Sequence, residues 1–184
     1  MKKSIIIAVT FALFYSIVRY NVFGNMPLSD IPLFIANKAI AFSMIIILMI
    51  AFVKYNSKNK DECVLYIDVF KIFSVIHVLI TISLLSQNYY PKLFSDNKLT
   101  LFGSLAILAG ILSFTYMINK KFIIKLILLY SLVAVHVLFL GVKGWFAVEK
   151  WNGMMPPITL ICFLMLATLI ILSALKKVDY FRAN

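Results

Sequence analysis

Two histidines, His77 and His136, are the only histidines in the 184-residue chain, and each lies in a strongly apolar stretch. His77 belongs to KIFSVIHVLITISLLSQNYYPK and His136 to LLYSLVAVHVLFLGVKGW. An imidazole in a hydrocarbon environment costs free energy unless another group pairs with it. Either each ring is hydrogen-bonded on its own, or the two rings together bind a metal centre.

The spacing of the histidines favours a shared metal centre. The two predicted helices run in the same direction, and at about 1.5 Å per residue the rings lie about 18 Å and about 21 Å from the helix starts. His77 and His136 are therefore expected at a similar depth. The alternative stays open, because Ser74 and Thr81 are close enough to His77 on its own helical face to hydrogen-bond to it.

Two imidazoles alone favour haem over other metal centres. Zinc and non-haem iron need further ligands, and Asp68 lies about 13 Å below His77 along the helix. Asp68 is instead expected to pair with Lys71, three residues further on. Axial ligation of haem needs only two protein ligands, because the porphyrin supplies the other four. With no C-x-x-C-H motif in the chain, we predict one haem b, its iron between His77 and His136.

A lysine near the end of another apolar stretch is a candidate partner for the haem carboxylates. The segment PLFIANKAIAFSM places Asn37 and Lys38 about one and a half turns inside that end. A lysine at this depth either extends toward the surface or pairs with an anion, such as a haem propionate. The predicted cofactor-binding residues are Asn37, Lys38, Ser74 and Thr81. In LTLFGSLAILAGILSF, small residues such as Gly103 and Gly110 either permit close helix packing or leave room for a flat macrocycle.

Six long apolar stretches must position these residues. The chain is 63% hydrophobic, whereas soluble domains are roughly 45–50% apolar. Each stretch approaches or exceeds the roughly 20 residues that cross a bilayer as a helix. We predict an all-α integral membrane protein, a single domain over residues 1–184 that forms a bundle of six transmembrane helices. Their predicted bounds are residues 4–23, 32–53, 65–86, 99–118, 122–142 and 156–175.

The distribution of basic residues predicts the orientation of the bundle. The loops on one side carry ten Lys and Arg residues, and those on the other side carry five. The positive-inside rule therefore places both termini in the cytoplasm, and we expect a multi-pass protein of the bacterial cytoplasmic (inner) membrane. The net charge of +11 then reflects contact with anionic membrane lipid, not with nucleic acid. The larger group is Lys2, Lys3, Lys54, Lys58, Lys60, Lys120, Lys121, Lys176, Lys177 and Arg182; the smaller is Arg19, Lys92, Lys98, Lys143 and Lys150.

The loops contain two further groups of interest. Tyr89 and Tyr90, in QNYYPKLFSDNK, are typical of an aromatic belt at the membrane interface. Lys120, Lys121 and Lys125 either contact lipid headgroups or receive a flavin phosphate or an acidic donor protein.

The chain resembles the ferric reductase-like transmembrane domains, which have six helices with haem-ligating histidines on the third and fifth. This superfamily includes NADPH oxidases, STEAP metalloreductases and the bacterial haem subunit of the methionine sulfoxide reductase system. NKAIAF is similar to their N-[RK]-A element, and HVLITISLLS and HVLFLGVKGW look like their third and fifth helices. Two-haem members carry a second histidine about thirteen positions along each helix, where this chain has Val64 and Ile123. The resemblance therefore implies a single haem in the outer half of the bilayer, similar to the STEAP arrangement.

Together these features predict a membrane b-type cytochrome, an oxidoreductase component that transfers electrons through one iron centre. The donor is a quinol or a flavin (FAD or FMN), and the acceptor lies at the outer face. A cytoplasmic flavoprotein or a periplasmic redox protein would be the partner, and no catalytic residue is predicted. Two alternatives stay open: a haem-free membrane scaffold with packed histidines, and a small-solute transporter whose path the histidines line.

Overall fold

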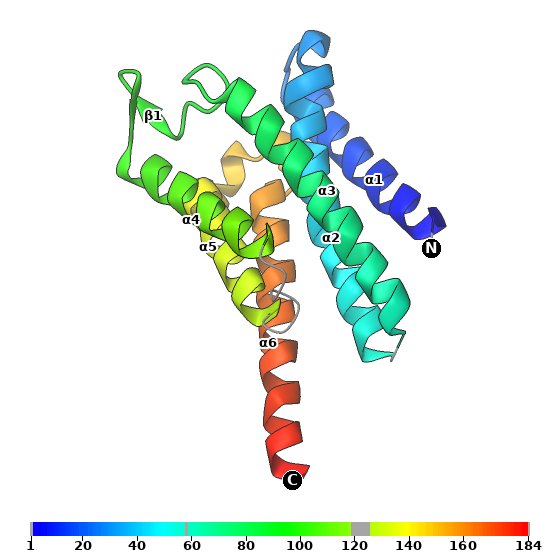
Figure 1. Ribbon diagram of the computed structural model, residues 1–184. Helices are drawn as coiled ribbons and strands as arrows, with labels where there is room; N and C mark the ends of the chain where they lie inside the picture. The colour runs from blue at the N-terminus through cyan, green and yellow to red at the C-terminus, as the bar shows by residue number, and fades with distance from the viewer. Residues whose placement is uncertain (1, 58, 119–125, 184) are drawn as a thin grey trace.

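The computed structural model describes residues 2–57, 59–118 and 126–183, without the side chains of residues 30, 60 and 177–183, and the chain is predominantly helical (Figure 1). Six of its helices are long and apolar enough to cross a membrane, by length and composition. Within the described residues, the prediction of a helical bundle with six such helices is confirmed. The helices are α1 (Lys2–Ile17), α2 (Ala36–Asn56), α3 (Lys60–Leu84), α4 (Leu101–Ile118), α5 (Leu126–Trp145) and α6 (Ile158–Ala183).

The helix bounds differ from the predicted ones where polar residues join a helix. α3 begins at Lys60 rather than at residue 65, because the Asn59 side chain accepts a hydrogen bond from the Glu62 backbone N–H at 3.3 Å and caps the helix. α6 continues to Ala183, beyond the predicted residue 175. The predicted start of the fifth helix, residues 122–125, lies outside the described residues. The predicted ion pair is confirmed, with Lys71 Nζ 3.0 Å from Asp68 Oδ1.

Two π-helical segments face one another where the first helix ends and the second begins. The segment Val18–Val22 extends α1, and Ile31–Ile35 leads into α2. The Tyr20 and Phe34 rings of these segments meet edge to face, with their centroids 6.1 Å apart. π-Helical turns are rare and often lie at functional sites. Here they set the start of α2 and so the position of Asn37.

The six helices form two groups of three (Figure 1). In the first group α1 and α3 pack on α2, and in the second α4 and α6 pack on α5. α2 also packs on α6 and joins the groups, whereas α3 and α4 make only weak contact. The groups therefore stay apart on the α3–α4 side.

The outward faces of the helices are rich in large apolar side chains. Phe14 on α1, Leu79 on α3, Ile111 on α4 and Leu172 on α6 are all exposed. Such faces are costly in water and suit contact with lipid acyl chains. These faces fit a multi-pass membrane protein.

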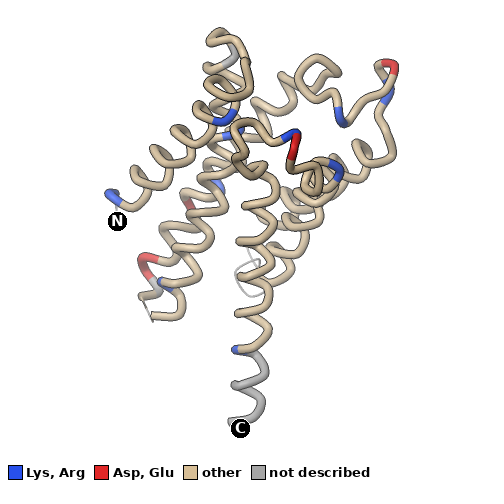
Figure 2. Tube along the Cα trace, turned by 180° about the vertical axis from the view of Figure 1, so that it is seen from behind, with Lys and Arg blue, Asp and Glu red and all other residues tan. Residues whose placement is uncertain are grey.

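One end of the bundle carries the longer connections, and charged residues lie largely toward the two ends (Figure 2). We call the end formed by residues 23–31, 85–100 and 146–157 the long-loop end. Its α3–α4 connection contains a short antiparallel pair, β1 (Phe94–Ser95) and β2 (Lys98–Leu99). Its α5–α6 connection contains two 3-10 helices, Val148–Lys150 and Asn152–Met154.

Candidate haem-binding site

A cavity of about 380 Å³ lies between the two groups of helices. Its volume falls in the range of about 300–1,000 Å³ that is usual for small-molecule sites. His77 of α3 and His136 of α5 both line it, together with Lys38 of α2 and Gly110 of α4. The structure thus brings the two predicted metal ligands and the predicted carboxylate partner to one cavity. His77 lies seven residues before the end of α3 at the long-loop end, and His136 lies near the middle of α5.

The His77 ring is held by a side chain of another helix. Its Nδ1 lies 2.7 Å from Asn37 Oδ1. The Asn37 Nδ2 group donates to Thr81 Oγ1 at 3.0 Å and to the Tyr90 hydroxyl at 3.1 Å. With this orientation of the amide, Nδ1 of His77 carries the hydrogen and donates it, because an amide oxygen only accepts.

The His136 ring is held by a backbone carbonyl. Its Nδ1 lies 2.7 Å from the Ala106 carbonyl oxygen on α4, so Nδ1 again carries the hydrogen. Gly110 makes this approach possible, since a Cβ at that position would lie only 2.9 Å from His136 Nδ1. Gly103 instead allows the backbone of Leu93 to pack closely against α4, because a Cβ at Gly103 would overlap that backbone. Small residues of α4 thus provide both close packing and space beside a ring.

Within the part of the chain that the structure describes, both histidines have the same arrangement, in which Nδ1 makes a hydrogen bond and Nε2 makes none. Among the described residues, no hydrogen bond involves Nε2 of either ring. Histidines that ligate metals usually donate their other N–H to a carbonyl, carboxylate or water, which fixes the tautomer. The described part of the chain contains no group of three or more His, Cys, Asp or Glu residues that could hold a metal ion. The cavity lining also contains the thiol of Cys162 and the thioethers of Met44 and Met117, but the two imidazoles are the donors that haem iron accepts as a pair.

Lys38 lies at the cavity with aromatic rings, not a carboxylate, beside its ammonium group. The ammonium lies 4.9 Å from the centre of the Phe34 ring and 4.7 Å from that of Tyr90. Within the described ranges, the ion pairs are Lys54–Glu62 and Lys71–Asp68, and neither involves Lys38. A cation placed in this way can receive an anionic group of a ligand.

The structure does not contain the alternative in which Ser74 or Thr81 of the same helix hydrogen-bonds to His77. The Ser74 hydroxyl donates to the Phe70 carbonyl at 2.8 Å, one turn earlier on its own helix. Thr81 accepts its hydrogen bond from Asn37, so it contacts His77 only through that amide. Both residues still line the cavity, as expected of cofactor-binding residues.

Tyr90 is the site residue that the sequence did not indicate. It was expected in an interface belt, but its hydroxyl contacts Asn37, its ring contacts the Lys38 ammonium, and it lines the cavity. Burial raises the pKa of the Tyr90 hydroxyl, and its hydrogen bonds with Asn37 and Thr81 oppose that rise. The Asn37–Tyr90 contact spans 53 residues of sequence, so no local pattern could predict it.

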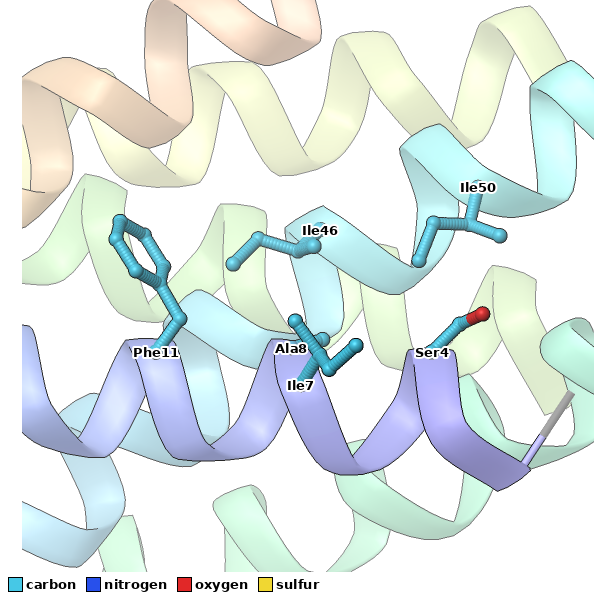
Figure 3. A pocket seen from close by; sticks show the side chains of 6 residues that line it. All are labelled: Ser4, Ile7, Ala8, Phe11, Ile46 and Ile50. Atoms are coloured by element: carbon cyan, nitrogen blue, oxygen red, sulfur yellow. The ribbon is translucent and has the colours of Figure 1, made fainter.

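A second cavity, of about 310 Å³, lies between α1 and α2 (Figure 3). It has no titratable side chain, and its single polar side chain is that of Ser4. This composition suits an acyl chain of a lipid but no chemistry. Its lining residues are Ser4, Ile7, Ala8, Phe11, Ile46 and Ile50.

The basic group Lys120, Lys121 and Lys125, for which a flavin or donor contact was considered, lies outside the described residues. Comparisons of the chain with protein-family models, with curated proteins and with solved structures found no match.

Proposed function

We propose that the chain is a membrane b-type cytochrome of the ferric reductase-like kind, with one haem bound between His77 and His136. The observation that carries this proposal is that both histidines line one cavity and use Nδ1 for hydrogen bonds, so that both Nε2 atoms are left for iron. His77 and His136 would hold the haem, and the haem would supply one-electron transfer. Lys38 would pair with a haem propionate.

The cavity itself argues against a haem-free scaffold with packed histidines. Protein interiors are close-packed and rarely leave voids much larger than a water molecule. The cavity of about 380 Å³ that both histidines line has room for a ligand or for lipid, and the Nε2 atoms without a hydrogen bond among the described residues favour a ligand. A solute path also has little support, because toward the end opposite the long-loop end the lining residues are apolar, such as Met117 and Leu129.

The proposed orientation places the long-loop end outside. The opposite end contains the start of α1, the α2–α3 turn and the end of α6, which carry most of the larger basic group. By the positive-inside rule this end would face the cytoplasm. The haem would then lie in the outer half of a bacterial cytoplasmic membrane, near an acceptor at the outer face.

Quinol is the proposed electron donor. The cavity is lined on the α3–α4 side by Ile82, Leu85 and Ile111, whose exposed fractions are 66%, 38% and 57%. These side chains are apolar and would face lipid, so a lipid-soluble donor could approach the cavity between α3 and α4. A cytoplasmic flavin donor would instead have to deliver electrons from the far end of the bundle.

Stopped-flow reduction of the protein in liposomes tests this function. Menaquinol or ubiquinol alone should reduce the wild type, and reduced flavin alone should not. His77→Ala and His136→Ala should each lose the haem and the signal. Ser83→Ala and Ser131→Ala should keep both, because these hydroxyls only bond to carbonyls of their own helices, those of Leu79 and Ile127. Rapid reduction by flavin with none by quinol would exclude the proposed donor, and a protein without haem would exclude the function.

A further inference from the structure

Asn37 connects three segments of the protein through one side chain. It is 1% exposed and lies in the first turn of α2, directly after the π-helical segment Ile31–Ile35. Its amide meets His77 and Thr81 of α3 and Tyr90 of the α3–α4 connection. An amide buried so completely, with every contact made to a side chain, is placed to orient its partners.

The orientation of this amide decides which nitrogen of His77 can bind a metal. With Oδ1 toward the ring, Nδ1 must donate and Nε2 has a free lone pair. With the amide turned over, Nδ2 would donate to Nδ1, and the hydrogen would sit on Nε2, where it blocks ligation. The hydroxyls of Thr81 and Tyr90 act as acceptors for both hydrogens of Nδ2, so the first orientation leaves no amide hydrogen unpaired.

We propose that Asn37, held by Thr81 and Tyr90, is a positioning residue that keeps the His77 ring in the Nδ1–H tautomer with Nε2 free for a metal. This inference rests on the proposed function for its purpose, since the free Nε2 would ligate haem iron. Such a positioning residue is needed because an isolated histidine side chain in water prefers the Nε2–H tautomer. Asn37 works against that preference.

His136 provides an internal reference for this proposal. Its Nδ1–H donates to the backbone carbonyl of Ala106, which cannot turn over and which no side-chain substitution removes. A change at Asn37 should therefore alter the tautomer of His77 and leave that of His136 unchanged. With only two histidines in the chain, both rings can be followed separately, and the His136→Asn variant identifies the His77 signals.

Nitrogen-15 NMR of haem-free protein labelled at histidine measures the tautomers directly. Both rings of the wild type should be Nδ1–H. In Asn37→Leu the His77 ring should change to predominantly Nε2–H, whereas Asn37→Asp should restore Nδ1–H because a carboxylate also accepts. Tyr90→Phe keeps Asn37 but removes one of the two hydroxyls that hold its amide, so part of the His77 population should change to Nε2–H. This variant provides the test if Asn37→Leu does not fold. Ser83→Ala, which also removes a hydroxyl from α3, should change nothing.

The result that would overturn the proposal is a His77 ring that is Nε2–H in the wild type, or one that stays Nδ1–H in Asn37→Leu or does not shift in Tyr90→Phe. The measurement needs no haem, so it separates the two claims. If the tautomers are as expected in a protein that never binds haem, the proposed function fails and the role of Asn37 stands. If haem binds and the tautomers do not respond, only the role of Asn37 fails.

Discussion

Replacing Gly110 by alanine tests whether His136 needs the space beside α4. A Cβ at Gly110 would lie 2.9 Å from Nδ1 and 3.0 Å from Cε1 of the ring, closer than side chains pack. To reach an ordinary contact the ring must move away by about 0.5 Å. The hydrogen bond to the Ala106 carbonyl, now 2.7 Å, would then lengthen to about 3.2 Å, the long end of the usual range.

The cost of this shift follows from the burial of the ring. Removing the partner of a buried N–H altogether costs about 1–3 kcal/mol, so a lengthened hydrogen bond should cost about 1 kcal/mol at most. Because about 1.4 kcal/mol corresponds to a tenfold change in affinity, Gly110→Ala should weaken haem binding up to about 5-fold. The substitution should not weaken the helix, since alanine is favoured over glycine in a helix interior by about 1 kcal/mol.

Gly144→Ala is the matched control. A Cβ at Gly144 would meet only Lys92 Nζ, at 2.9 Å, which is the end of a flexible side chain and can move aside. Haem titration of haem-free protein, followed by absorbance, gives the dissociation constants of both variants. Gly144→Ala should match the wild type. Equal affinities for Gly110→Ala and Gly144→Ala would refute the assignment of His136 as a ligand that depends on this space.

Three further predictions concern charges and orientation. Lys38→Met should weaken haem binding about 10- to 150-fold in the same titration, because it removes a charge-assisted contact worth about 1.5–3 kcal/mol. Lys38→Arg keeps the charge and should retain most of the affinity. Equal affinities for the two variants would argue against a propionate partner. Arg19→Gln should lower the thermal midpoint of the protein in detergent, because the buried guanidinium donates to the Met155 carbonyl and ties the α5–α6 connection to the π-helical segment Val18–Val22. An unchanged midpoint would mean that this contact contributes nothing. Reporter fusions at Asn184 and within residues 88–97 should report cytoplasmic and external locations, respectively, and the reverse result would place the site in the inner half of the membrane.

Local sequence patterns predicted the six helices and the histidine pair, because both depend on apolar length and on rise per residue. The partners of the histidines could not be predicted in this way. Asn37 lies 40 residues from His77, and Ala106 lies 30 residues from His136. These contacts depend on how helices pack and, for Asn37, on the π-helical segment before α2, which hydropathy does not reveal. The alternative in which Ser74 hydrogen-bonds to His77 is not found, because the Ser74 hydroxyl bonds to the Phe70 carbonyl four residues earlier, as a serine hydroxyl in a helix readily does.

The absorbance spectrum of the purified protein tests the central claim most directly. Protein from haem-replete cells should be red, with the sharp reduced α and β bands of a low-spin b-type haem and about one haem per chain. His77→Ala and His136→Ala should each abolish this spectrum. A well-folded wild-type preparation that is colourless would contradict the account.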